Sequence, residues 1–201
     1  MSAKFKDSTD LQPPGAGLPA LERATLNIAF KTAAAVFSDR QALRLLRRDS
    51  AELLRLADED ESYDVFQVLV IPRVIGIEDS SRNWSVLMVL EHLCLTNHDM
   101  LEIIKALVDG IVPRGEVDVA MYKPAPNIGY DVLDRFRDLT QVYVATVEQL
   151  LESRGNLETS ARYRHPWFGR LNAHQWHCLA AVHQRIHRRQ MQKLVAMLGV
   201  T

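Results

Sequence analysis

The segment from Asn172 to Leu198 constrains the fold most, because its apolar residues recur at the spacing of an α-helix. An α-helix advances about 100° per residue, so residues three or four apart share one face. One stripe of this helix is mainly apolar and comprises Leu179, His183, Ile186, Gln190, Leu194 and Met197, with His187 at its edge. A helix with one apolar stripe buries that stripe against other elements. The sequence therefore predicts a long helix packed into a helical core.

Two histidines of this stripe, His183 and His187, lie one turn apart and are expected to point into the core. Their ring nitrogens can converge on one metal ion, so the pair provides half of a metal site. The alternative is that one or both are core histidines satisfied by hydrogen bonds. The opposite side of the helix carries residues that we expect on the surface: His174, His177, Arg185 and Arg188.

A second helical pattern, from about Trp84 to Val108, is apolar nearly all round, as a central helix should be. One narrow polar strip interrupts it and comprises Ser85, His92, Thr96 and Asp99. Polar groups buried on such a helix cost free energy unless they find partners, so the strip should face something specific. His92 supplies the third inward imidazole that the His183/His187 pair lacks. Without an ion, the same groups would form a hydrogen-bonded core network.

Further segments have helical patterns. A helix is expected from about Leu18, with a break at the capping-box sequence Ser38-Asp39-Arg40-Gln41 and a restart over residues 40–57. Another helix is expected over residues 130–153, with Gly155 as its C-terminal stop. The predicted fold class is all-α, an antiparallel four-helix bundle with long connecting loops.

The connecting segments are interpreted from proline, glycine and charge. Residues 1–17 are expected to be a flexible leader to a single domain over residues 18–201, and the acidic residues 58–61 a solvated turn. Residues 63–78 fit either a strand or a buried helical turn. A strand there would lack a partner in a helical chain, so we favour a helix or a packed loop. Residues 110–129 form a long connection, either a lid over a site or a crossover.

An aromatic and basic loop, residues 162–169, leads into the last helix, whose start matches an N-cap at Asn172. Arg162, Arg164 and Arg170 lie near the expected mouth of a pocket. They are candidates for binding the carboxylate of a cofactor, although loop arginines usually serve only as solvated charges.

Composition and charge exclude some function classes. The chain has 201 residues, with 24 Lys and Arg against 25 Asp and Glu, so its net charge of −1 gives no electrostatic case for nucleic-acid binding. No apolar segment is long enough to span a bilayer, and the N-terminus has no apolar signal-peptide core. We therefore expect a cytoplasmic protein with no membrane partner. Cys94 and Cys178 lie in apolar helical patterns, as expected for buried thiols in a reducing compartment.

With these features assembled, the sequence resembles the DinB/YfiT-like metalloenzyme family. The matching residues are Asn83-Trp84-Ser85 through Glu91-His92-Leu93, His165-Pro166 with Gly169, and His183-x-x-x-His187. The resemblance covers roughly Leu18 to Leu198 and implies a four-helix bundle in which the three histidines hold a divalent ion, nickel or zinc, at the mouth of a pocket. It also implies a homodimer and a small-molecule substrate, with a low-molecular-weight thiol as cofactor in some relatives.

Chemistry of the residues leads to a similar hypothesis. Three neutral imidazoles with an open fourth position are the ligand set of a catalytic metal site, where the ion lowers the pKa of a water or thiol. Asp99, two turns from His92, is a candidate to orient a ligand imidazole or accept a proton; alternatively it pairs with an arginine. We expect a metal-dependent transferase or hydrolase that activates a thiol or water against a small electrophile. The alternatives are a bundle that binds a metal or ligand without turnover, and a purely structural bundle.

Overall fold

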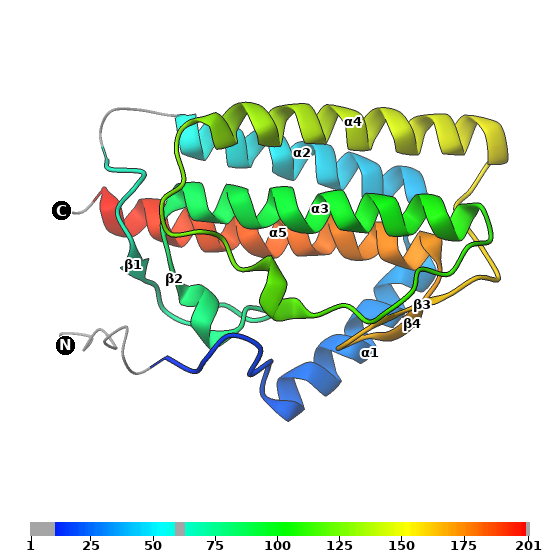
Figure 1. Cartoon of the computed structure of the whole chain (residues 1–201), viewed down its shortest axis with the longest axis horizontal. Coiled ribbons are helices and arrows are strands. Elements are labelled where there is room, and N and C mark those ends of the chain that lie inside the picture. Colours follow the sequence, from blue (N-terminus) through cyan, green and yellow to red (C-terminus); the bar gives the residue numbers. More distant parts are fainter. Residues whose placement is uncertain (1–10, 59–62, 200–201) are drawn as a thin grey trace.

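Four helices lie side by side and form a bundle in this computed structural model, which describes residues 11–58 and 63–199 (Figure 1). They are α2 (Asp39–Asp58), α3 (Val86–Val108), α4 (Asp131–Arg154) and α5 (Ala173–Leu198). α2 and α5 run in one direction, and α3 and α4 run in the other (Figure 1). The predicted all-α four-helix bundle is confirmed.

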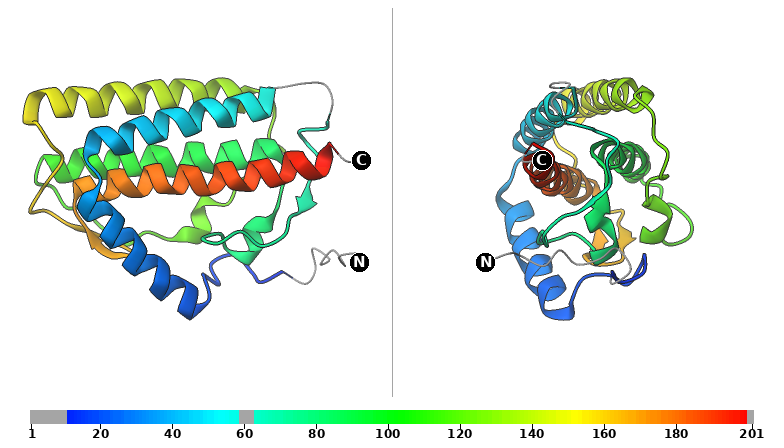
Figure 2. Two further views of the ribbon diagram at one scale, coloured as in Figure 1. Left: turned by 180° about the vertical axis from the view of Figure 1, so that it is seen from behind. Right: turned by 90° about the vertical axis from the view of Figure 1, so that its left-hand side faces the viewer.

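A second layer covers one side of the bundle, against α3 and α5 (Figure 2). It contains α1 (Ala20–Val36) and two short 3-10 helices, η2 (Asp79–Arg82) and η3 (Val119–Tyr122). It also contains two antiparallel strand pairs, β1 (Leu69–Val70) with β2 (Asn83–Trp84) and β3 (Tyr163–His165) with β4 (Gly169–Leu171). η3 lies in the long connection between α3 and α4. Because these two helices run in the same direction, this connection crosses back along the length of the bundle (Figure 1).

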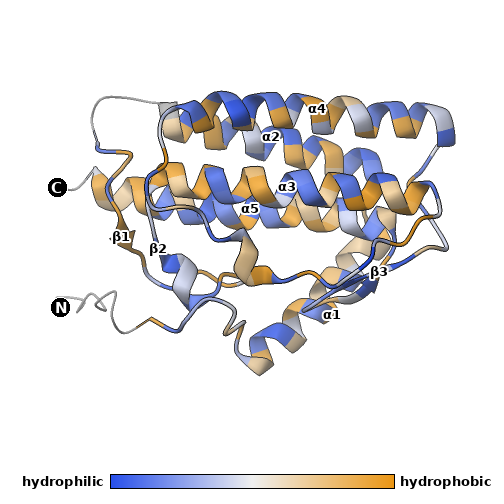
Figure 3. Ribbon diagram, in the orientation of Figure 1, coloured by the Kyte–Doolittle hydropathy of each residue, from blue (hydrophilic) through white to orange (hydrophobic). Residues whose placement is uncertain are grey.

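α3 is the central helix, and apolar residues cover much of its length (Figure 3). Most of its residues are buried, as its sequence predicted, apart from an exposed stripe that contains His98, Glu102 and Lys105. Ser85 caps its N-terminus, because Oγ accepts a hydrogen bond from the N–H of Met88 at 3.2 Å. Ser85 is therefore the N-cap of α3, and the polar strip that we expected on this helix begins at His92.

The predicted helix boundaries follow from local hydrogen bonds. Between α1 and α2, Gln41 Oε1 accepts from the N–H of Ser38 at 2.8 Å, and Ser38 Oγ accepts from the N–H of Gln41 at 3.3 Å. At the start of α5, Asn172 and Gln175 form the same reciprocal pair, at 2.9 and 3.1 Å. Both capping boxes satisfy backbone donors that the first helical turn leaves free.

The segment between α2 and α3 contains a strand that we did not expect. β1 pairs with β2, which directly precedes α3 in residues where the helical pattern suggested a helix start. The strand thus has a partner, and our argument against it was wrong. The remainder is mostly a packed loop, as predicted, with Val65 and Ile71 buried.

The aromatic and basic segment before α5 is a β-hairpin, where we expected a loop. Successive side chains of a strand point to opposite faces. Tyr163 and His165 are therefore buried, while Arg164 between them is exposed and pairs across the hairpin with exposed Arg170. This alternation decides which side chains of the segment reach the interior.

The opposite face of α5 is buried as well, so the prediction that His174 and His177 lie on the surface was wrong. His174 donates from Nδ1 to Asp39 Oδ1 at 2.7 Å and from Nε2 to the carbonyl oxygen of Ala34 at 2.8 Å. His177 donates from Nε2 to the carbonyl oxygen of Asp39 at 3.1 Å. α5 packs against α2 on this side and against α3 on the other. A single apolar stripe therefore underestimates the buried surface of a helix with neighbours on two sides.

Arg185 and Arg188 are half-buried, where we expected outward side chains. Their Nε atoms lie 3.2 and 3.3 Å from the carboxylate of Asp49 on α2, which has an exposed fraction of 0%. A carboxylate in this position needs cationic partners, because burial of an unpaired charge is costly.

Part of the expected leader, residues 11–17, is hydrogen-bonded to the second layer. The N–H of Gly17 donates to Glu78 Oε1 at 2.9 Å, and the N–H of Gln12 donates to Asp79 Oδ2 at 3.1 Å. Residues 1–10, and most of the acidic turn expected at 58–61, lie outside the described residues.

Cys94 and Cys178 are both buried as free thiols, in agreement with the sequence. Within residues 11–58 and 63–199, no helix has the length and hydropathy to span a membrane.

Candidate metal centre

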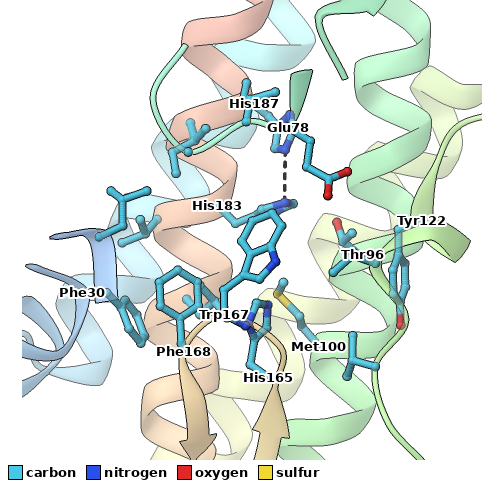
Figure 4. Close-up of a pocket in the computed structure, with 18 of the residues that line it drawn as sticks. Phe30, Glu78, Thr96, Met100, Tyr122, His165, Trp167, Phe168, His183 and His187 are labelled. Carbon is cyan, nitrogen blue, oxygen red and sulfur yellow. Dashed lines mark hydrogen bonds between the residues drawn. The ribbon is translucent and has the colours of Figure 1, made fainter. Parts of the chain in front are cut away.

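Three histidine rings meet between α3 and α5. His92 comes from α3, and His183 and His187 come from successive turns of α5. Nε2 of His183 lies 3.2 Å from Nε2 of His92 and 3.1 Å from Nε2 of His187, the contact drawn in Figure 4. One nitrogen from each ring lies within 4.8 Å of the other two. The structure thus brings together the three histidines that helical periodicity selected.

Hydrogen bonds fix which nitrogen carries the proton in two of these rings. His92 donates from Nδ1 to the carbonyl oxygen of Tyr122 at 2.6 Å. His187 donates from Nδ1 to Gln190 Oε1 at 2.7 Å, and this amide is itself oriented because its Nε2 donates to the carbonyl oxygen of Ser81 at 2.6 Å. In a neutral imidazole the other nitrogen is then an acceptor. Nε2 of His92 and Nε2 of His187 therefore both present lone pairs toward His183.

His183 differs, because its Nδ1 is buried and has no hydrogen-bond partner in the described part of the chain. If Nε2 of His183 carries the proton, it can donate to only one of the two lone pairs that face it. If Nδ1 carries the proton, three lone pairs face one another. A divalent cation would satisfy all three nitrogens, and a set of three neutral imidazoles suits zinc or nickel.

The spacing of the nitrogens agrees with such an ion. Two ligand nitrogens of a tetrahedral zinc ion, with Zn–N distances of 2.0–2.1 Å, are separated by roughly 3.3 Å. The separations of 3.2 and 3.1 Å at His183 are close to this value. The residues present therefore fit a three-histidine metal site.

Burial holds the three rings in the neutral form. Loss of hydration lowers the pKa of His92 to about 4, and it lowers the pKa values of His183 and His187 well below the usual range. At His92 the hydrogen bond to the Tyr122 carbonyl opposes this effect on the pKa without outweighing it, and the charges of Lys123 and Glu78 act in opposite directions. A metal ion binds the neutral ring, so the histidines need not lose a proton to bind it at neutral pH.

An indole and an ion pair flank the triad. The Trp84 ring stacks on His187 with centroids 5.9 Å apart and lies 5.0 Å from the ring of His92. Lys123 Nζ lies 5.7 Å from the Trp84 ring and donates to Glu78 Oε2 at 2.7 Å. These contacts fix the histidine rings and neutralise the two charges beside them.

A cavity of about 310 Å³ lies beside the triad, between the bundle and the second layer. Phe30, Trp167 and Phe168 of the second layer reach it from one side, and Thr96 and Tyr122 from the other (Figure 4). Most of its wall is apolar and includes Met100, Ile103, Trp176, Leu179 and Ile186. The three nitrogens therefore face a small, mainly apolar chamber, as in many small-molecule sites.

Asp99 lines this cavity, but the side chain that it contacts is Tyr122. Its Oδ2 accepts a hydrogen bond from the Tyr122 hydroxyl at 2.7 Å. Burial and this hydrogen bond both raise the pKa of Tyr122. The group that orients His92 is the carbonyl of Tyr122, so Asp99 acts on the histidine only through that residue.

The three arginines that we considered for cofactor binding are not part of the cavity wall. Arg162, Arg164 and Arg170 are all exposed. Arg162 donates to Gln175 Oε1 at 3.3 Å. The structure does not bring them to the histidines.

Several residues of the site were not selected from the sequence. Three of them, Glu78, Tyr122 and Lys123, lie in the connections between the bundle helices. In these connections no hydrophobic periodicity predicts which way a side chain points. Gln190 did carry a signal, because it is a polar residue on the apolar stripe three positions after His187. His165 lines the cavity and entered our interpretation only as part of a family pattern.

Comparison with known proteins adds little to this picture. No protein-family model and no curated protein matches the chain. Among solved structures it is similar to "Crystal structure of TT2238, a four-helix bundle protein", with 23% sequence identity and a TM-score of 0.48. That match covers 76% of this chain and 96% of the other. At this similarity it supports no statement on function, and membership of the DinB/YfiT-like family stays a prediction.

Proposed function

We propose that the chain is a divalent-metal-dependent enzyme of the DinB/YfiT-like type, in which His92, His183 and His187 hold a nickel or zinc ion. One observation carries the proposal: the fixed Nδ1–H groups of His92 and His187 direct two lone pairs at Nε2 of His183. A core network without an ion would leave at least one of these acceptors without a donor, which is costly in a buried site.

The side chains around the triad have separate roles in this proposal. A bound divalent ion supplies Lewis acidity, which activates a water or thiol and polarises an electrophile. The Tyr122 carbonyl and Gln190 keep two ligand rings in the tautomer that exposes Nε2. The apolar wall holds the carbon skeleton of a substrate beside the three nitrogens and excludes bulk water from it.

The cavity favours a small nucleophile. Glu78 is paired with Lys123, and Asp99 already accepts from Tyr122, so the charged side chains of the wall are engaged. The exposed arginines lie elsewhere. A thiol with large charged groups would keep those groups outside the cavity, whereas water or a small thiol enters it.

The hydrogen bonds of these carboxylates favour a second candidate function, a bundle that binds a metal or ligand without turnover. A general base needs a free acceptor within reach of the proton it removes. The carboxylates of Glu78 and Asp99 both line the cavity; both oxygens of Glu78 already have partners within the protein, and Oδ2 of Asp99 accepts from Tyr122.

Metal content is the first test. Protein purified without a nickel column should bind one equivalent of zinc or nickel, measured by elemental analysis and titration. A His183→Ala variant should lose this binding. His98→Ala is the matched control, because His98 is an exposed histidine of α3 and should bind as wild type. If wild type and His183→Ala take up the same amount of metal, the proposal is wrong.

Turnover is the second test. Metal-loaded wild type is assayed with a panel of small thiols and a chloro-dinitroarene, and with small esters and lactones in the absence of thiol. A rate above background that disappears in His187→Ala supports the enzyme, and the substrate series separates transfer from hydrolysis. Metal binding with no turnover of either series favours the binding protein.

A further inference from the structure

A fourth histidine, His165, lines the same cavity at the end of β3. Only 8% of its surface is exposed. Its ring is surrounded by the rings of Trp167, Phe168 and Trp176, with centroids 6.0, 5.0 and 5.5 Å away. In Figure 4 it lies with Met100 at the end of the drawn cavity away from His187. It is thus a polar ring in aromatic surroundings, on the wall of the chamber.

The position of the proton on this ring is fixed. Nδ1 accepts a hydrogen bond from the backbone N–H of Trp167 at 3.1 Å. Burial lowers the pKa of His165 to about 3, so the ring is neutral at physiological pH. A neutral imidazole whose Nδ1 is an acceptor carries its proton on Nε2. His165 is therefore an N–H donor under all ordinary conditions.

This donor lacks an acceptor. No residue in the described part of the chain forms a hydrogen bond with Nε2 of His165. Nor is Nε2 among the fully enclosed polar atoms without a partner, so part of its surface is accessible, in a residue that lines the cavity. An N–H group in apolar surroundings costs free energy until it meets an acceptor. A ligand that fills the cavity would bring one.

The size of the chamber limits what this ligand can be. An apolar cavity of ~150 Å³ holds benzene. The present cavity, of about 310 Å³, is roughly twice as large and suits a two-ring aryl group or a branched chain of similar volume. Lys123 is the only Lys or Arg that lines the cavity in the described part of the chain, and it is paired with Glu78, so the wall offers no free cation for an anionic ligand; Asp99 accepts a hydrogen bond from Tyr122.

We infer that the cavity binds an uncharged, mainly apolar molecule of about naphthyl size that carries one acceptor oxygen, and that the Nε2–H group of His165 donates a hydrogen bond to this oxygen. The ligand would be the substrate of the proposed enzyme, so its identification as a substrate rests on the proposed function. Its binding, however, depends only on the cavity and on His165. His165 is accordingly a specificity-determining residue that selects an oxygen acceptor within an apolar skeleton.

The test compares two probes of nearly equal shape, 2-acetonaphthone and 2-isopropenylnaphthalene, which differ in that a carbonyl oxygen replaces a methylene group. Both are titrated into metal-free protein by fluorescence or calorimetry. Changing His165→Phe keeps an aromatic ring and removes the donor. It should weaken binding of the ketone by about fivefold to tenfold, while the affinity for the hydrocarbon changes less than twofold. The exposed control, His98→Phe, should change neither.

A measurement on the wild type covers the case in which His165→Phe does not fold. With ¹⁵N-labelled histidine, the Nε2 resonance of His165 should shift on addition of the ketone and not on addition of the hydrocarbon. The inference is overturned if the variant loses both ligands equally, if neither probe binds wild type, or if the resonance responds alike to both.

These outcomes are separate from those of the proposed function, because no metal is present in the test. Discrimination between the probes in a protein that never binds metal would leave this inference intact and remove the enzyme. Metal-dependent turnover without discrimination between the probes would support the proposed enzyme and overturn this inference.

Discussion

Gln190 fixes the tautomer of the His187 ring. It is almost fully buried, and its amide bridges the carbonyl oxygen of Ser81 and Nδ1 of His187. Replacing Gln190 with Leu removes the acceptor that fixes the tautomer of His187. Loss of such an outer-shell partner typically weakens metal affinity by about 10–100-fold, and we expect this loss in competition with a chromophoric zinc chelator.

The matched control is Gln192→Leu, two positions further along α5 at an exposed site. It should bind zinc as wild type does. Equal affinity of Gln190→Leu and wild type would mean that Gln190 does not set the orientation of the ligand ring.

At this scale the sequence predicted which three histidine rings would meet, but not the groups that hold them in place. His92, His183 and His187 follow from the 3.6-residue period, which is local and can be counted along the chain. The partner of His92 is a backbone carbonyl at Tyr122, in a segment without periodicity. Side-chain type carries no information on which backbone carbonyl approaches a ring, so this contact could not be found from the residues.

Among the elements, the first turn of α5 contacts both α1 and α2 through His174, which forms an ion pair with Asp39 of α2 and a hydrogen bond to Ala34 of α1. His174, in the first turn of α5, donates from both ring nitrogens, to Asp39 and to the carbonyl of Ala34, so its ring is protonated. The hydrogen bond to Asp39 raises the pKa of His174 to about 11. Burial raises the pKa of Asp39, but hydrogen bonds from His174 and from the N–H of Leu157 outweigh burial and the net pKa is lowered.

Stability should therefore depend on pH with a defined sign. The pKa of His174 is higher in the folded chain than its usual value near 6.5, so folding takes up a proton above that pH. The stabilisation is complete below pH 6.5 and is lost as the pH rises toward 11. The contribution of Asp39 is lost only when the pH falls below its usual value of 3.8, outside this window.

A His174→Gln variant tests this effect, because Gln keeps a donor but cannot carry the charge. In urea unfolding at pH 6 it should be less stable than wild type by about 3 kcal/mol, as expected for a broken buried pair. At pH 9 the difference should be smaller. His98→Gln is the exposed control, with no expected effect at either pH. A difference of the same size at pH 6 and pH 9 would show that His174 is neutral in the folded chain.

Elements were predicted well where a pattern is long and poorly where it is short. α3, α4 and α5 each extend over more than six turns, so their periodicity outweighs local exceptions. β1 and β2 have two residues each, too few for alternation to register. His174 and His177 show a second limit, because a hydrophobic stripe reports one buried face and α5 has two.

For the whole molecule, metal binding and stability should be linked. An ion that binds only the folded chain stabilises it by about 2.7 kcal/mol at a free concentration 100 times the Kd. For a domain of this size, this corresponds to a rise in Tm of roughly 5–10 °C. Addition of zinc to metal-free protein in a thermal scan should produce this rise, and a chelator should reverse it.

The variants separate a specific effect from general ion binding. His98→Ala should show the same rise as wild type, while His183→Ala should show none. A rise that persists in His183→Ala would place the ion elsewhere on the protein.

Two of the three ring nitrogens belong to α5, which follows all the other described elements in the chain. During synthesis His92 leaves the ribosome with α3, and His183 follows only 91 residues later. Until then the nascent chain contains only one histidine of the triad, and the cavity lacks the wall that α5 provides. If the triad binds an ion as proposed, only a chain whose α5 has been made and packed can bind it, and a prematurely terminated chain would lack two of the three histidines.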